Sequence, residues 1–185
     1  MKSTVLLARL SVILLLLSSS LFASAQTCTG ATIPSCDVAD AGDVNGFVPS
    51  AELPCVVQGQ ATEIAIPFKV FATINGDSVY RMRIESIGNV PCGLCWKSSN
   101  SGNVFMKDEA GCFVVRGTTT EAAGQYALNI VLSFDTANSG SFNVSNVQLS
   151  SMVSAADLVY VRLVNENSEC APVNLNGSGL NSNCQ

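Results

Sequence analysis

Residues 111–126 read GCFVVRGTTTEAAGQY, a short β-type run that ends in a glycine–threonine turn, followed by a second strand that opens at Gly124-Gln125-Tyr126. Beyond Tyr126 the apolar side chains alternate with others. One predicted face carries Leu128, Ile130, Leu132 and Phe134, and the other carries Asn129 and Ser133. A period of two is typical of a strand with one buried face. The stretch therefore predicts a β-sandwich module of an extracellular protein, and it indicates no chemistry.

The N-terminal residues 1–25 have the three parts of a secretory signal peptide. Lys2 and Arg9 supply positive charge, an almost wholly apolar run follows from Leu10, and Ala23-Ser24-Ala25 has the small-x-small pattern of a cleavage site. A membrane anchor is disfavoured because the apolar run is too short for a hydrocarbon core of ~30 Å. We expect a cleaved leader, no stable membrane span afterwards, and secretion to the extracellular space or cell surface, or export to the periplasm.

All eight cysteines lie in the predicted mature chain, residues 26–185, which keeps seven basic and fourteen acidic residues and so has a formal charge of −7. An even number of cysteines behind a signal peptide predicts four structural disulfides in an oxidising compartment. Eight cysteines allow 105 connectivities, among which the sequence does not choose. The candidate disulfide residues are Cys28, Cys36, Cys55, Cys92, Cys95, Cys112, Cys170 and Cys184.

The mature chain divides into three predicted parts. Residues 26–54 form a Cys-rich, loop-like segment, residues 55–164 carry the alternating β pattern, and residues 165–185 are an Asn/Ser/Gly-rich tail tied back through cysteines. Seven or eight short strands separated by turns indicate a sandwich, with no helix. The expected strands are 63–74, 80–85, 104–106, 112–116, 125–135, 141–149 and 157–164, with a hairpin turn at Asn75-Gly76 and a loop over 89–102.

Three short motifs occur in a recognisable order. They are Asn89-Val90-Pro91-Cys92-Gly93-Leu94, Gly117-Thr118-Thr119-Thr120, and Ala123-Gly124-Gln125-Tyr126 before an alternating strand that ends at Asp135. Over residues 55–136 the chain thereby resembles the immunoglobulin-like (Ig-like, cadherin-like) modules of secreted bacterial cell-surface proteins, in their Cys-bearing variant. That family has a Leu-Pro-x-Gly-Leu turn, then Gly-Thr-Pro-Thr, then Ala-Gly-x-Tyr; here Thr119 replaces the proline.

The resemblance implies a disulfide-stapled, Ig-like antiparallel β-sandwich used for adhesion, with a surface protein or a glycan as its partner. It transfers no site residues, because the shared positions are turn and core positions. From the residues themselves we expect Tyr126 to pack inward and to form a hydrogen bond through its hydroxyl. The predicted function is that of an exported non-catalytic surface or binding module whose ligand is unknown.

Cys92-Gly93-Leu94-Cys95 is the one motif with the spacing of a catalytic dithiol. An oxidoreductase places its attacking cysteine at a helix N-terminus, which lowers the thiol pKa, and the residues after Cys95 do not predict a helix. A structural disulfide is favoured, either Cys92–Cys95 or one of the two to Cys112. A periplasmic thiol–disulfide protein that uses Cys92 and Cys95 remains the alternative function, and an all-thiolate zinc site is disfavoured in an oxidising compartment.

Composition argues against several other functions. The chain has no histidine, which removes Ser-His-Asp and Cys-His nucleophile systems, and its acidic residues mostly occur singly. We therefore predict no enzyme, no catalytic residue, no metal and no cofactor. The segment Asp37–Asn45 is rich in oxygen ligands, but its spacing differs from a calcium-binding EF-hand loop, so a solvated acidic loop is favoured. Scattered basic residues in an acidic chain argue against nucleic acid.

Trp96 is the aromatic residue that we would test for binding. It lies beside the cysteine pair in a predicted loop, where an exposed ring could stack on a sugar. The competing interpretation is a ring packed over the neighbouring disulfide, which the sequence favours. Trp96 is thus a tentative binding residue only.

Overall fold

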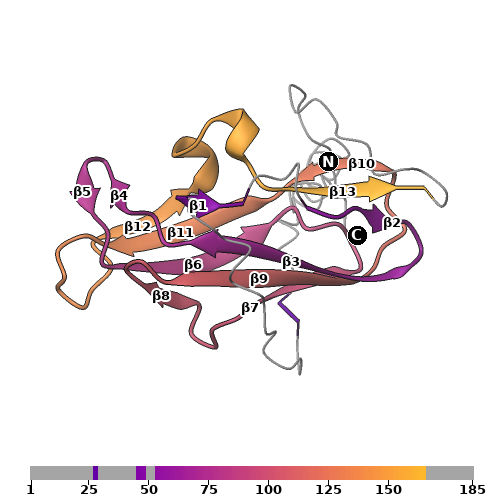
Figure 1. The fold of residues 1–185 in the computed structure, drawn as a ribbon. Helices are drawn as coiled ribbons and strands as arrows, with labels where there is room; N and C mark the ends of the chain where they lie inside the picture. Colours follow the sequence, from indigo (N-terminus) through magenta and orange to yellow (C-terminus); the bar gives the residue numbers. More distant parts are fainter. Residues whose placement is uncertain (1–26, 29–44, 49–52, 166–185) are drawn as a thin grey trace, which may run out of the picture.

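The structure, a computed structural model, describes residues 27–28, 45–48 and 53–165, and these are almost entirely β-strands and turns (Figure 1). The predicted signal peptide, Cys36, Cys170, Cys184, nearly all of the acidic segment and all of the tail beyond Asn165 lie outside the described residues. The described part of the chain carries the other five cysteines, Cys28, Cys55, Cys92, Cys95 and Cys112.

One side of the molecule is a four-stranded sheet in the order β1-β3-β9-β7, with all neighbours antiparallel. Its strands are β1 (Gly46–Phe47), β3 (Ala61–Lys69), β9 (Ala110–Thr118) and β7 (Leu94–Ser98). The β3–β9 pair is continuous from Ala61 opposite Thr118 to Lys69 opposite Ala110. This long pair is the backbone of the sheet, and β1 covers only its Lys69 end.

The other side is built around one long strand that changes partner. It consists of β10 (Gly124–Ala127) and β11 (Asn129–Asp135), which are separated only by Leu128. The four-stranded sheet β12-β11-β6-β8 adds β12 (Val144–Gln148), β6 (Arg81–Gly88) and β8 (Val104–Met106). The three-stranded sheet β10-β13-β2 adds β13 (Tyr160–Val164) and β2 (Val56–Val57), which is parallel to β13.

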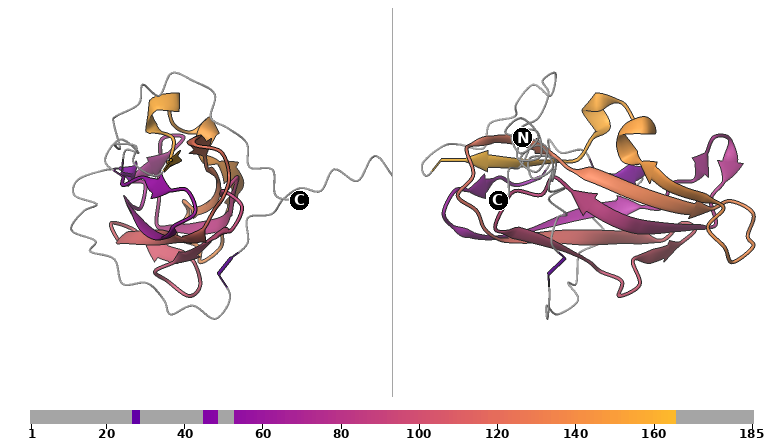
Figure 2. Two further views of the ribbon diagram at one scale, coloured as in Figure 1. Left: turned by 90° about the vertical axis from the view of Figure 1, so that its right-hand side faces the viewer. Right: turned by 180° about the vertical axis from the view of Figure 1, so that it is seen from behind.

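Two smaller features complete the fold. A hairpin of β4 (Thr73–Ile74) and β5 (Asp77–Ser78) turns at Asn75 and Gly76, whose φ angles of 53° and 89° are those that the predicted hairpin signal requires. The 3₁₀ turns η3 (Leu149–Ser151) and η4 (Ala155–Asp157) lie between β12 and β13. In the end-on view of Figure 2 the strands lie around a common interior, and the buried hydrophobic side chains form one cluster.

The core follows from strand alternation, as the sequence predicts. Leu128, Ile130, Leu132 and Phe134 are all buried, and so are Met82 and Ile84 of β6. Phe68 meets Phe105 with ring centroids 4.8 Å apart in an edge-on arrangement. Burying each such side chain fully stabilises the fold by roughly 1.5–3 kcal/mol. Ser133, expected on the outer face, is also buried, and its hydroxyl accepts a hydrogen bond from the N–H of Asn146 in the neighbouring strand β12 (3.2 Å).

The all-β prediction is confirmed, but the loop predicted over 89–102 is partly wrong. Its middle forms β7, which pairs with β9 from Leu94 opposite Gly117 to Ser98 opposite Phe113. Buried and half-buried residues alternate through β7, so the period of two was present over only five residues. Cys92 and Gly93 stay in the turn, which the Leu94 N–H closes on the Pro91 carbonyl oxygen (3.0 Å).

The glycines of two sequence motifs meet in space where β7 begins. Gly93 has φ +85°, and a Cβ there would collide with the carbonyl oxygen of Thr118. Gly117, with φ +134°, lies against the carbonyl oxygen of Gly93 in the same way. Both positions therefore require glycine for two reasons. The positive φ disfavours other residues, and the neighbouring backbone leaves no room for a Cβ atom. The turn before β7 and the end of β9 dock through these two residues.

Cys95 is bonded to Cys28, with Cα atoms 5.1 Å apart. The predicted pairing of Cys95 with Cys92 or with Cys112 is therefore wrong. Cys95 and the core residue Trp96 point to opposite sides of β7, so Cys95 faces outward. There Thr27 forms a parallel bridge with Trp96, and the Cys28 N–H donates to the Trp96 carbonyl oxygen (3.0 Å). Cys55, Cys92 and Cys112 are disulfide-bonded as well.

Replacing Gly93 or Gly117 by alanine should lower the free energy of unfolding by about 2 kcal/mol or more, because each Cβ adds steric collision to a strained φ. Urea unfolding of the purified protein measures the change. Gly102→Ala is the matched control, since a Cβ there would meet only the Asn100 side-chain oxygen at 3.6 Å. Equal stability of all three variants would contradict the docking of the two motif glycines.

Replacing Cys28 and Cys95 together by serine should lower the free energy of unfolding by roughly 4 kcal/mol, because the disulfide closes a loop with a sequence separation of 67. Denaturant titration without reductant measures this loss. Mass spectrometry of non-reduced peptides is the control and should find Cys28 joined to Cys95. A Cys92–Cys95 peptide would contradict the structure and would revive the dithiol alternative.

Candidate binding pocket

β12 and β13 pair with consecutive parts of the β10–β11 strand, and residues 149–159 connect them. This connection, which we call the excursion, leaves the sheets and carries η3 and η4 (Figure 1). Between this excursion, the β4–β5 hairpin and β1 lies a cavity of about 760 Å³, which we call the edge pocket. Its lining consists of Asn45, Phe47, Phe71, Thr73, Ile74, Asn75, Val147, Leu149, Ser151, Met152, Val153, Ser154 and Asp157. Such a volume is typical of a small-molecule site.

The floor of the edge pocket is apolar and continuous with the core. Phe71, Ile74 and Leu149 are buried, whereas Phe47 is only partly covered. The rings of Phe47 and Phe71 lie edge-on with centroids 6.4 Å apart, and Phe71 is 6.0 Å from Phe134 of the core. The floor is therefore held rigidly by side chains that the fold buries for its own stability.

Polar side chains form the rim. Asn45 accepts the Ala72 N–H through Oδ1 (2.8 Å), and this bond ties the residue before β1 to the segment before β4. The Ser151 hydroxyl donates to the Gln148 carbonyl oxygen (2.7 Å), and the Ser154 hydroxyl donates to Asp157 Oδ2 (2.6 Å). Within the described part of the chain, Thr73 and Asn75 make no side-chain hydrogen bond, and both are exposed.

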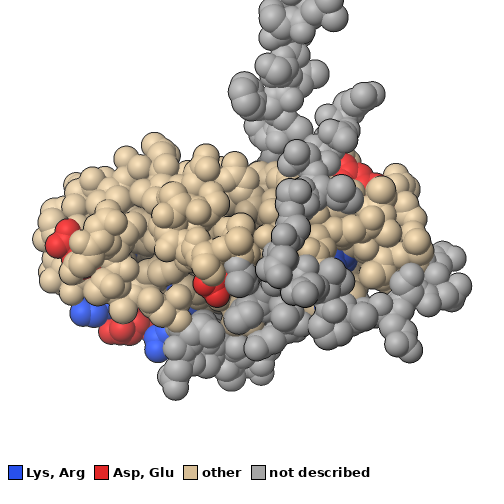
Figure 3. Space-filling model, turned by 90° about the horizontal axis from the view of Figure 1, so that it is seen from above, with Lys and Arg blue, Asp and Glu red and all other residues tan. Residues whose placement is uncertain are grey.

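The edge pocket has almost no charge. Among the described residues that line it, Asp157 is the one ionisable side chain, and there is neither lysine nor arginine. The chain from Thr136 to Ala156 has no charged residue at all. Figure 3, which looks onto the η3–η4 side, shows few charged side chains, mostly near the margins of the molecule. The pocket therefore has no group that would neutralise an anionic ligand.

Trp96 is not part of this site. Its side chain is 3% exposed, and its ring packs edge-on against Phe113 with centroids 6.5 Å apart. The tentative assignment of Trp96 as a binding residue assumed an exposed ring in a loop, and the structure instead places Trp96 in β7 with its ring turned into the core. The structure brings Trp96 close to Cys28 and Cys95, but it leaves no exposed aromatic face there.

Sequence reasoning missed the edge pocket. Its lining comes from three separate stretches, so no short motif contains it. A local signal did exist in residues 149–154, Leu-Ser-Ser-Met-Val-Ser, where apolar residues persist after the period of two has ended. That pattern indicates a segment that is no longer part of a strand but whose apolar side chains still pack on the core.

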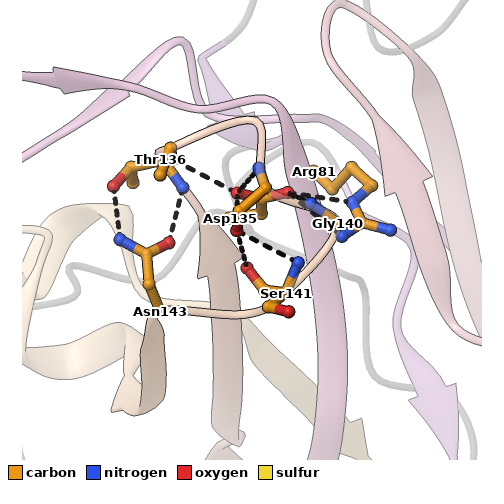
Figure 4. Close-up of polar contacts among 8 residues, drawn as sticks. Arg81, Asp135, Thr136, Gly140, Ser141 and Asn143 are labelled. Atoms are coloured by element: carbon orange, nitrogen blue, oxygen red, sulfur yellow. Dashed lines mark hydrogen bonds and ion pairs between the residues drawn. The ribbon is translucent and has the colours of Figure 1, made fainter.

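A second polar cluster surrounds Asp135, at the end of β11 (Figure 4). Its carboxylate accepts hydrogen bonds from the Arg81 guanidinium (Nη2, 3.0 Å) and from the N–H groups of Ala137, Ser139 and Gly140 (3.1–3.2 Å). Burial raises the pKa of Asp135, but these donors outweigh burial and hold the pKa below its ordinary value.

The Asp135 cluster organises a loop. Asn143 extends it by accepting the Thr136 N–H (2.8 Å) and donating to the Thr136 hydroxyl (2.8 Å). Because the Asp135 carboxylate is surrounded by donors and is 1% exposed, it is a structural anion and has no room for substrate. Within the described residues no group of three or more His, Cys, Asp or Glu side chains could hold a metal ion. None of the helices described there is long and apolar enough to span a membrane.

Fold and pocket together define a disulfide-bonded, all-β protein with one core and a largely uncharged pocket at a strand edge. In comparisons with known proteins, no family model, no curated protein and no solved structure matches this chain.

Asp135→Asn should destabilise the fold at neutral pH and should make stability less dependent on pH in acid. A carboxylate whose pKa is lowered by folding stabilises the protein above its unfolded pKa of about 4, and that stabilisation is lost as the pH falls toward the folded value. Urea unfolding between about pH 2 and pH 7 should show the wild type and the variant converging at low pH. Asp77→Asn, at an exposed hairpin position, is the control and should follow the wild-type profile.

Proposed function

We propose that this protein is an exported, non-catalytic binding module with an Ig-like β-sandwich, and that its ligand site is the edge pocket. The observation that carries the proposal is the pocket itself, a cavity of about 760 Å³ with a rigid apolar floor and a polar rim. A preformed concave site of this kind is the default location for a ligand.

The strand order supports the Ig-like part of the proposal. Ig constant-type domains have strands A, B, E and D in one sheet and C, F and G in the other. If β1, β3, β9 and β7 are A, B, E and D, their order β1-β3-β9-β7 agrees. The neighbours β6, β10–β11 and β12–β13 then correspond to C, F and G, with the G strand interrupted by the excursion that lines the pocket.

Tyr126 supports the same interpretation. It is buried near the start of β10, and its hydroxyl donates to the Ala122 carbonyl oxygen (2.9 Å). Ig-like domains have a tyrosine corner at this place, between strands E and F. The chain's single tryptophan lies in β7, however, rather than in β6, where antibody domains carry theirs. The proposal therefore concerns an Ig-like topology and not an antibody-type core.

Export and the absence of catalysis rest on the chain's composition. The leader-like residues 1–25 and the disulfide-bonded cysteines both suit an oxidising compartment. A chain without histidine has lost the commonest general base. The dithiol alternative has no comparable support, because Cys95 is bonded to Cys28.

Thr73→Trp should reduce ligand binding at least tenfold by filling the mouth of the edge pocket with an indole ring. Thr73 is an exposed lining residue, so the variant should fold normally. The ligand is first found by screening residues 26–185 against immobilised glycans, matrix proteins and cell envelopes, and affinity is then measured by biolayer interferometry.

Thr120→Trp is the matched control for this test, since Thr120 is exposed, follows the C-terminal end of β9 and does not line the edge pocket. The control should bind like the wild type. Equal binding by all three proteins would show that the ligand site is elsewhere on the molecule.

A further inference from the structure

We propose that the edge pocket binds a neutral saccharide. This inference rests on the proposed function and adds the chemical class of the ligand. A pyranose ring has one face of C–H groups and a circumference of hydroxyls that both donate and accept hydrogen bonds. The edge pocket has the matching arrangement, with apolar side chains below and neutral polar side chains around them.

The floor provides the apolar contact. Phe47 is the partly covered aromatic residue of the lining, and Val147 and Met152 are half-buried beside it. Exposing such a surface in water is unfavourable, and the C–H face of a sugar would cover it. Phe71 is 5% exposed, so its part is to hold Phe47 in place rather than to contact the ligand.

The rim provides the polar contact. The Thr73 hydroxyl and the Asn75 amide are unengaged within the described residues, and Asn45 uses only Oδ1, which leaves its amide N–H groups available. Hydroxyl and amide groups supply donors and acceptors together, which is what adjacent sugar hydroxyls require. Asp157 adds a carboxylate acceptor, of which one oxygen binds Ser154. A purely apolar ligand would cover these groups without pairing them, at a cost in free energy.

Charge excludes the anionic sugars. Uronic acids and sulfated or phosphorylated glycans are bound best by lysine or arginine, and neither is among the described residues that line the edge pocket. Asp157 would repel them. The binding of a neutral saccharide, which forms no ion pair, should also be nearly independent of salt.

A peptide strand is the competing occupant, because β12 is an edge strand of its sheet. Strand addition needs a regular row of free backbone groups. In β12 that row is broken, since Asn146 has φ +56° and the register with β11 shifts between Leu132 and Phe134. Bulges of this kind protect edge strands from pairing. The local geometry therefore favours a ligand held by side chains.

The test is NMR titration of isotopically labelled residues 26–185 with methyl glycosides of glucose, galactose, mannose and N-acetylglucosamine and with their β-linked oligomers. At least one should perturb the amide signals of Thr73, Asn75 and Val153, at about 0.05 M and about 0.5 M NaCl alike. Thr73→Val, which is isosteric and lacks the hydroxyl, should weaken that binding about five- to tenfold. Thr120→Val is the control and should leave the affinity unchanged.

Three results would count against the saccharide inference. If no neutral saccharide perturbs the pocket, but a peptide or an anionic glycan does, the ligand class is wrong while the edge pocket remains the binding site. If neutral saccharides bind and Thr73→Trp leaves their affinity unchanged, both the inference and the proposed site fail. If the Thr73→Val variant binds like the wild type, the Thr73 hydroxyl does not contact the ligand, and the proposed polar contact at the rim is wrong.

Discussion

Burial of one aromatic core between the β3–β9 pair and the β6–β11 pair is the interaction on which the rest of the structure depends. Phe68, Phe113, Phe105 and Phe134 come from four different strands and are all fully buried. Phe68 meets Phe105 edge-on, and Phe134 meets Phe71 edge-on. Phe47, at the rim of this core, packs against Phe68, Phe71 and Phe113. The edge pocket exists because this aromatic chain reaches the surface at the point where β1 ends and β12 has no outer neighbour.

The covalent and polar features of the molecule act on its periphery. The Cys28–Cys95 disulfide holds Thr27 and Cys28 on the outside of β7, and the Asp135 cluster holds the loop between β11 and β12. The close contact between Gly93 and Gly117 joins the turn before β7 to the end of β9. Each of these features fixes a segment outside the core, and together they keep the edges of the sheets in place.

The same division bears on function. Side chains that bury the core also make the pocket floor, so the site is rigid without a dedicated scaffold. Its rim comes from the β4–β5 hairpin and from the excursion that interrupts the last strand, both of which are peripheral. Such peripheral segments can vary in sequence at little cost to the core. The proposed ligand specificity thus lies in the part of the molecule that stability constrains least.

Strand periodicity and turn chemistry were predictable because both are local. Three features needed only residues within a few positions of one another. They are the burial of Leu128, Ile130, Leu132 and Phe134, the Asn75-Gly76 hairpin and the hydroxyl contact of Tyr126. The burial of Trp96 could not be predicted in this way. Its five-residue segment is a strand because β9 lies alongside it, and that partner is not visible in the local sequence. The cysteine count predicted disulfides, but the pairing of Cys28 with Cys95 required the fold to bring residue 28 to β7.

The sequence by itself determined that the described chain is β-structured, that one face of β6 and of the β10–β11 strand is apolar and buried, and where the Asn75-Gly76 turn lies. Only the tertiary structure decided which strands are neighbours, which cysteine Cys95 meets and where a pocket opens. The physical reason is that hydrophobic burial is encoded residue by residue, whereas a cavity depends on the approach of segments far apart in the chain. Asn45, Thr73 and Ser154 share one rim because the core places them there.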